Sequence, residues 1–302
     1  MIYGKTALFF LCMKTTEIIK NNPIKVPFPS LILGLDISTA CIGISIIYDD
    51  GINEPIIEFI SHVSPKINKD KMGIEALILR KEIFENDFLN KIGEIIEKLD
   101  CPLKTITECV IESPMTYATG SSNAATVAML LQFNGILSDS VYRVLGIIPY
   151  YVSSYDARMA SFPELLTIRK FNKRGEIYPV KHIDKAIKDN NLVLFGSYPF
   201  DCEKKSIMMN VVTEKYPKIP WIYNKKGDLK KENYDSCDAL VCALAYSNLK
   251  RYGEIDAHIV QSIKTECLNG ETKFTYTVQI WNKIFAHDLV VPAPVITDAE
   301  ES

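Results

Sequence analysis

The 302-residue sequence lacks the residue spacings that mark zinc sites and membrane spans. Its four histidines stand alone, and its eight cysteines are scattered without a CxxC pair. These patterns argue against a structural zinc site and indicate buried thiols of a reducing compartment. No apolar run reaches the ~18 residues that a membrane helix needs. The apolar stretch behind Lys5 has no small-residue cleavage site after it, which disfavours secretion and leaves Met13 as an alternative start.

The sequence also carries little net charge, −3 at pH 7, which argues against a histone-like DNA-binding protein. The charge is unevenly distributed, however. Residues 166–231 contain 15 Lys and Arg against 7 Asp and Glu, so the rest of the chain is clearly acidic. A basic segment on an acidic body fits either a solvated lysine-rich surface or a surface that binds a polyanion. With no targeting signal, we expect a location in the cytoplasm, at a nucleoid or viral replication site, or in an organelle.

Apolar periodicity predicts an α/β fold. Strands are expected at Leu31–Asp36, Ile42–Tyr48, Pro55–Val63, Thr105–Ile111 and Ile147–Val152, and in a C-terminal hairpin at Lys273–Ile280 and Ile284–Val291. Helices are expected at Met72–Leu99, Ala124–Leu145, Ser154–Phe162, Glu203–Tyr216 and Tyr234–Lys250. We interpret residues 1–30 as a leader, 31–250 as one domain with a basic insertion near 163–202, and 251–302 as an extension.

Four acidic residues stand in apolar surroundings. Asp36 and Glu112 each end an apolar strand. Asp235 and Asp238 are three residues apart in an apolar helix, which places them on one helix face. Each has a structural alternative: Asp36 as the start of a turn, Glu112 as a cap on the following loop, and Asp235 as a helix N-cap.

Asp238 is harder to explain as a structural residue. A carboxylate on the apolar side of a helix is destabilising by several kcal/mol unless it is paired or bound to a metal. Four acids brought together would also repel one another, and a divalent cation removes that repulsion. Oxygen ligands without histidine or cysteine suit Mg²⁺ or Mn²⁺. Two such ions about 4 Å apart can activate water and stabilise the leaving oxygen in phosphodiester cleavage.

The chain resembles the RuvC-type Holliday junction resolvases of the ribonuclease H superfamily between Leu31 and Tyr246. The matching stretches are GLDIST at 34–39, VIESP at 110–114, LLQFNG at 130–135, EKKS at 203–206 and DSCDALVCALA at 235–245. The resemblance implies a ribonuclease H-like mixed sheet, with an antiparallel hairpin plus parallel strands, flanked by helices. It also implies a homodimer formed through the helix near 124–145.

Particular residues take roles from this resemblance. The implied metal ligands are Asp36, Glu112, Asp235 and Asp238. Lys205, or its neighbour Lys204, matches the basic residue near the scissile phosphate. The aromatic wedge that opens the junction in the family falls at Met115, with Tyr117 two residues on, and the choice between them stays open.

Basic residues around the expected site are candidates for contacts to DNA phosphates. They are Arg169, Lys170, Lys173, Arg174, Lys204, Lys205, Lys225, Lys226, Lys230 and Lys231. Aromatic residues among them could stack on opened bases or simply pack in the protein.

Together these features predict a Mg²⁺-dependent endonuclease, with Mn²⁺ as an alternative ion, that resolves four-way DNA junctions. One alternative is a related nuclease acting on flaps, forks or structured RNA. Another is a non-catalytic junction-binding protein. A sugar kinase or actin-like ATPase also begins with a strand, an acid and a hairpin. Such an enzyme would need a second glycine-rich phosphate loop and a duplicated domain, and the sequence contains neither.

Overall fold

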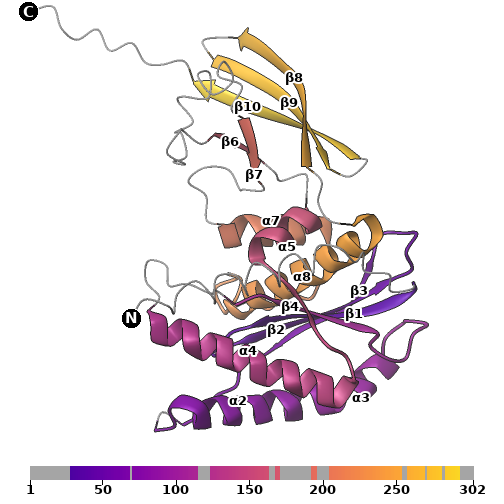
Figure 1. The fold of residues 1–302 in the computed structure, drawn as a ribbon, viewed down its shortest axis with the longest axis vertical. Coiled ribbons are helices and arrows are strands. Elements are labelled where there is room, and N and C mark those ends of the chain that lie inside the picture. The colour runs from indigo at the N-terminus through magenta and orange to yellow at the C-terminus, as the bar shows by residue number, and fades with distance from the viewer. Residues whose placement is uncertain are drawn as a thin grey trace, which may run out of the picture.

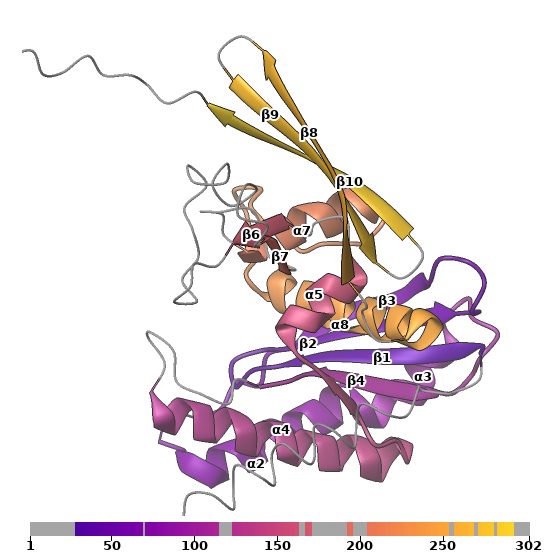
Figure 2. The ribbon, with the colours of Figure 1, turned by 45° about the horizontal axis from the view of Figure 1, so that its top comes forward.

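The computed structural model describes residues 28–68, 70–114, 123–162, 167–170, 192–195, 204–253, 257–268, 271–280 and 283–292. Its centre is a five-stranded sheet between two layers of helices (Figure 1, Figure 2). The strands are β1 (Ser30–Ile37), β2 (Ile42–Asp49), β3 (Ile56–Val63), β4 (Glu108–Glu112) and β5 (Tyr150–Val152). Their order in the sheet is β3-β2-β1-β4-β5.

The sheet is mixed, as predicted. β2 runs antiparallel to β1 and β3, whereas β4 runs parallel to β1 and β5 parallel to β4. In the register, Asp36 pairs with Gly43, and Leu35 pairs with Ile111 just before Glu112. The carboxyl ends of the parallel strands β1, β4 and β5 therefore meet at one edge of the sheet. The predicted α/β class, with an antiparallel hairpin plus parallel strands, is confirmed.

The residues of β1 alternate between two apolar cores. Leu31, Leu33 and Leu35 are fully buried in the core that the strands share with the first helix layer. Ile32 belongs to the core on the other face, so Gly34 and Asp36 share that face because strand side chains alternate. The apolar strand β1 thus presents its one acid, Asp36, on the face of the sheet opposite the first helix layer.

The first helix layer contains α2 (Gly73–Asp87), the 3-10 turn η1 (Leu89–Lys91), α3 (Ile92–Glu97) and α4 (Ala124–Leu145). The predicted single helix Met72–Leu99 is wrong, because the chain leaves helical geometry at Phe88, with φ −131° and ψ −66°. The break lets Phe88 and Leu89 both point into the core, where they are 2% and 0% exposed. The predicted bounds of α4 are those observed.

The second helix layer contains α5 (Ser154–Ser161), α7 (Lys204–Lys215) and α8 (Glu232–Tyr252), on the face opposite α2 and α4 (Figure 1). α8 lies directly on β1 and β2. A Cβ at Gly34 would lie 2.3 Å from the carbonyl oxygen of Ala239, and a Cβ at Gly43 would lie 1.9 Å from that of Asp235. Both sheet positions therefore require glycine for the helix to approach this closely.

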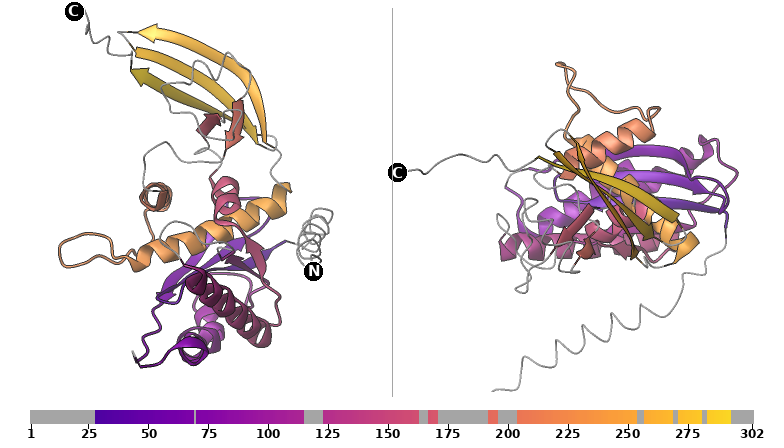
Figure 3. Two further views of the ribbon diagram at one scale, coloured as in Figure 1. Left: turned by 60° about the vertical axis from the view of Figure 1, so that its left-hand side comes forward. Right: turned by 90° about the horizontal axis from the view of Figure 1, so that it is seen from above.

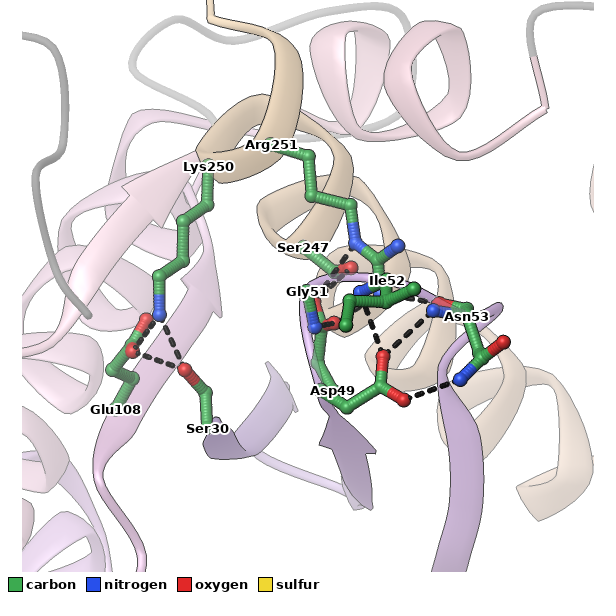
Figure 4. A network of polar contacts seen from close by, with 10 residues as sticks. Ser30, Asp49, Gly51, Ile52, Asn53, Glu108, Ser247, Lys250 and Arg251 are labelled. Carbon is green, nitrogen blue, oxygen red and sulfur yellow. Dashed lines mark hydrogen bonds and ion pairs between the residues drawn. The ribbon is translucent and has the colours of Figure 1, made fainter. Parts of the chain in front are cut away.

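The carboxyl end of α8 is tied to the sheet by buried charges (Figure 4). The Lys250 ammonium lies 2.5 Å from a Glu108 carboxylate oxygen, and it also donates to the Ser30 hydroxyl. Beside it, the Arg251 guanidinium pairs with Asp49. These contacts lie at the end of β1 opposite Asp36, so α8 is anchored at one end and carries its acids at the other.

Two smaller sheets lie outside the central one. β6 (Thr167–Lys170) and β7 (Leu192–Phe195) pair antiparallel within the predicted insertion. The C-terminal strands β8 (Ala257–Leu268), β9 (Glu271–Ile280) and β10 (Lys283–Pro292) form a three-stranded antiparallel sheet, of which the sequence predicted only the last two strands. Within the described ranges no helix is both long enough and apolar enough to cross a membrane.

Candidate functional site

Three of the predicted acids meet at the edge where β1 and β4 end. One carboxylate oxygen each from Asp36, Glu112 and Asp238 lies within 4.8 Å of the others. Asp36 and Glu112 come from adjacent parallel strands, and Asp238 comes from the second turn of α8 above them. The close helix approach at Gly43 brings Asp238 to the strand ends. The sequence named these residues, and the tertiary structure places them in one cluster.

The pKa of each of the three carboxyl groups is raised above its usual value. Burial first, and then the charges of Glu112 and Asp238, raise the pKa of Asp36 well above its usual range. Burial and the charge of Asp238 raise the pKa of Glu112 to about 7. Burial also raises the pKa of Asp238. The three carboxyl groups can all ionise in this one place only if positive charge nearby compensates them.

Lys205 supplies part of that charge. Its Nζ atom lies 3.4 Å from an oxygen of Asp238 and 3.8 Å from an oxygen of Asp235. Its side chain remains about half exposed, so it faces both the acids and the solvent. Burial tends to lower the pKa of Lys205, but the charges of Asp238, Asp36 and Asp235 outweigh burial and raise it. Asp235 thus stands beside the cluster of three, linked to it through the same lysine.

Sequence reasoning missed a second cation, Arg158 on α5. Its charge lowers the pKa of both Glu112 and Asp238, against the larger effect of burial. A neighbour on α5, Ser154, is hydrogen-bonded to Glu112. A signal was available in the sequence. Arg158 is the only basic residue in the helix that follows β5, and β5 ends at the same sheet edge as Asp36 and Glu112.

Sequence reasoning also missed Cys41, in the turn between β1 and β2. Its thiol is hydrogen-bonded to Asp235, and it lies 3.8 Å from the hydroxyl of Ser64. The turn is held by Ser38, whose hydroxyl donates to the carbonyl of Cys41 and accepts from its amide. No sequence pattern marks this contact, because it joins a strand turn to a helix some 200 residues later in the chain.

The donor set fits a hard divalent cation. All the converging ligand atoms are carboxylate oxygens, which Mg²⁺ and Mn²⁺ prefer, and no histidine lies among them. Lys205 and Arg158 offset only part of the cost of burying these charges, and a bound cation would offset more of it. The site therefore has the chemistry, burial and partial exposure that a metal-assisted reaction on a solvent-accessible phosphate requires.

Other predicted residues are described only in part. Lys204 opens α7, and Arg169 and Lys170 lie in β6, but only their backbones are described. Met115, Tyr117, Lys173 and Arg174 lie outside the described residues. The other predicted DNA contacts, Lys225, Lys226, Lys230 and Lys231, are exposed and lie in the connection before α8.

Comparisons with known proteins give likenesses of structure. No protein-family model matches the chain, and no curated protein matches its sequence. RuvC from Thermus thermophilus is similar with a TM-score of 0.41 and 12% identity, over 74% of this chain and 97% of RuvC. The same protein in complex with a Holliday junction substrate gives a TM-score of 0.42 and 11% identity, over 74% and 96%.

Two further structures are similar. The yeast mitochondrial Holliday junction resolvase Ydc2 has a TM-score of 0.41 and 12% identity, over 78% of this chain and 85% of Ydc2. The PPX-GPPA enzyme of Aquifex aeolicus has a TM-score of 0.29 and 7% identity, over 88% and 54%. At these identities and TM-scores the likenesses assign no family or activity to this chain. The chain itself has a mixed five-stranded sheet flanked by helices.

Proposed function

We propose that this protein is a divalent-metal-dependent endonuclease that cuts four-way DNA junctions. The observation that carries the proposal is the meeting of Asp36, Glu112 and Asp238 within 4.8 Å, beside the half-exposed Lys205. A buried cluster of acids bordered by a cation at the surface is suited to hold a metal and to receive a phosphate. The junction as substrate comes from the motif resemblance to RuvC-type resolvases.

Each residue of the site has a defined task in this proposal. Asp36, Glu112 and Asp238 hold Mg²⁺ or Mn²⁺. Asp235 acts as a further metal ligand or orients Lys205. The bound cation supplies Lewis-acid stabilisation of the phosphate and a more acidic water. Lys205 faces solvent from the edge of the cluster and attracts the scissile phosphate. Arg158 offsets part of the negative charge of Glu112 and Asp238.

The proposal is tested by comparing substrates side by side. The full chain is incubated with a synthetic four-way junction, a fork, a flap, a structured RNA and a linear duplex, with Mg²⁺ and with EDTA. We expect cleavage of the junction with Mg²⁺ and intact strands with EDTA. Preferential cleavage of forks, flaps or RNA would assign a related nuclease instead. Binding of the junction without cleavage in any metal would assign a non-catalytic protein.

Neutralising Lys204 and Lys205 together should weaken junction binding. A lysine that pairs with a DNA phosphate releases a counterion, and each lost contact lowers the slope of log K against log salt by about 0.9. We expect the Lys204→Gln, Lys205→Gln variant to have a shallower slope, measured by fluorescence anisotropy in EDTA. The Lys91→Gln, Lys98→Gln variant, which changes two exposed lysines around α3, is the control. An unchanged slope would remove this end of α7 from the DNA surface.

We also propose that α4 mediates a homodimer. Its solvent-exposed side carries small residues and three exposed apolar side chains, Leu131 (42% exposed), Tyr142 (53% exposed) and Val144 (41% exposed). A Cβ at Gly135 on the same helix would meet nothing within 4 Å, so the helix has room for a partner there. Gly135→Arg should shift the chain from dimer to monomer in analytical ultracentrifugation. Gly93→Arg, at an equally open glycine of α3, should leave the dimer intact.

A further inference from the structure

The connection between α7 and α8 contains a compact hairpin, residues 222–231, which we call the lysine hairpin. Tyr223 and Leu229 form its antiparallel bridge. Asn224 closes its turn, because its side-chain oxygen accepts from the amides of Lys226 and Asp228 at 2.8 and 3.0 Å. The Asn224 side-chain amide also donates to the Asp228 carboxylate at 3.1 Å. The hairpin thus has a defined conformation held by its own polar groups.

The base of the lysine hairpin is fixed to α8 and to the core. The side chain of Asn233, in the first turn of α8, accepts from the amide of Ile222 at 3.1 Å and donates to its carbonyl at 2.6 Å. Asn233 is only 3% exposed, and the preceding Trp221 is 9% exposed within the second core. Two buried side chains therefore hold the hairpin in place relative to α8.

The charge on the lysine hairpin is strongly positive. It carries four exposed lysines and a single acid, Asp228, whose carboxylate already accepts from Asn224. The lysines are Lys225, Lys226, Lys230 and Lys231. None of them forms an ion pair with any residue in the described part of the chain. Figure 3 shows the hairpin projecting from the body of the molecule at the start of α8.

The base of the lysine hairpin leads directly into α8, the helix that carries Asp235 and Asp238. Lys231 immediately precedes α8, and Asp235 lies four residues later, about 6 Å along the helix axis. Lys205, which contacts Asp235 and Asp238, lies on the same side of the sheet. A nucleic-acid strand that places a phosphate at the acids would thus have its neighbouring phosphates near the positive charge of the lysine hairpin.

We propose that the lysine hairpin is a preformed contact for the phosphate backbone of the DNA arm that leaves the cleavage site. This proposal rests on the proposed function and adds to it a specific binding element. Lysines act as point charges that suit repeated phosphates without reading bases. Because the turn is closed by Asn224 before DNA binds, little ordering entropy remains to oppose association.

The test measures junction binding in EDTA, where no cleavage takes place, over a series of salt concentrations. We expect the Lys225→Gln, Lys226→Gln variant to bind about tenfold more weakly at low salt and to lower the salt slope by one to two, since each phosphate contact contributes about 0.9. The control variant Lys91→Gln, Lys98→Gln removes the same charge from the far face and should bind as the unmodified chain does. Equal slopes for the two double variants would overturn the proposal.

A second variant separates a preformed element from a merely basic one. Asn224→Ala removes the side-chain hydrogen bonds that close the turn and keeps every lysine. We expect its affinity for the junction to fall about threefold while the salt slope stays the same. An Asn224→Ala variant with unchanged affinity for the junction would contradict the claim that the hairpin is a preformed contact. Both measurements report binding alone, so a chain that binds through this hairpin but never cuts would contradict the proposed nuclease and leave the hairpin contact standing.

Discussion

Asp36→Asn is expected to abolish junction cleavage while leaving junction binding largely intact. The charges of Glu112, Asp238 and Asp235 all raise the pKa of Asp36, and its carboxylate is a proposed ligand of the metal. An amide of the same shape keeps the fold but removes the negative charge that holds the cation. We expect a fall in the cleavage rate of about a thousandfold or more, equivalent to about 4 kcal/mol. Asp238→Asn should behave in the same way.

The same variant should be more stable than the unmodified chain when metal is absent. The pKa of Asp36 is raised on folding, first by burial and then by Glu112 and Asp238, so the folded chain holds this proton more tightly than the unfolded chain does. Ionised Asp36 therefore destabilises the metal-free fold above the unfolded-state pKa of about 3.9. Asp36→Asn should raise Tm in EDTA at pH 7.5, and this difference should shrink towards pH 4.

Adding Mg²⁺ should reverse the order of stability. A cation that binds only the folded state raises Tm, by an amount that increases with the logarithm of its concentration above Kd. The unmodified chain should gain Tm with Mg²⁺, whereas Asp36→Asn should gain little. Glu94→Gln, at an exposed acid of α3, is the matched control and should change neither cleavage nor the response to Mg²⁺. Normal cutting by Asp36→Asn would refute the assignment of the site.

Glu108→Gln is expected to give the largest loss of stability. Glu108 lies 2.5 Å from the ammonium of Lys250, whose side chain is 0% exposed. Without the carboxylate charge, the buried ammonium loses its ion-pair partner, and the contacts with the Ser30 hydroxyl and the Phe28 ring, whose centroid lies 4.2 Å away, carry no compensating charge. Breaking one half of a buried ion pair typically reduces the free energy of unfolding by about 3–5 kcal/mol. Urea denaturation followed by circular dichroism measures the change.

Two comparison variants show whether the loss comes from the unpaired charge. The double variant Glu108→Leu, Lys250→Met removes both charges and should recover most of the stability, because an apolar pair of similar size avoids desolvation. Glu75→Gln breaks the exposed pair with Lys71 and should change the free energy of unfolding by less than about 1 kcal/mol. A Glu108→Gln chain as stable as Glu75→Gln would show that the pair does not anchor α8.

The sequence alone predicted the α/β class and most elements around the central sheet. Its apolar runs predicted the strands β1, β2 and β3 to within about two residues, and helical spacing predicted α4 as observed. The prediction of one helix over Met72–Leu99 failed, because periodicity records which residues are apolar and not where the backbone bends to bury them. The break at Phe88 follows from packing two adjacent side chains against the sheet.

The sequence by itself also identified the acids of the site, since a carboxylate at the end of an apolar strand is conspicuous. Only the tertiary structure decided which of them meet: Asp36, Glu112 and Asp238 cluster, while Asp235 stands beside them with Lys205. It also brought Arg158 and Cys41 to the acids. Local patterns cannot reveal such contacts, because they depend on how closely α8 approaches Gly34 and Gly43, where a side chain would hold the helix away.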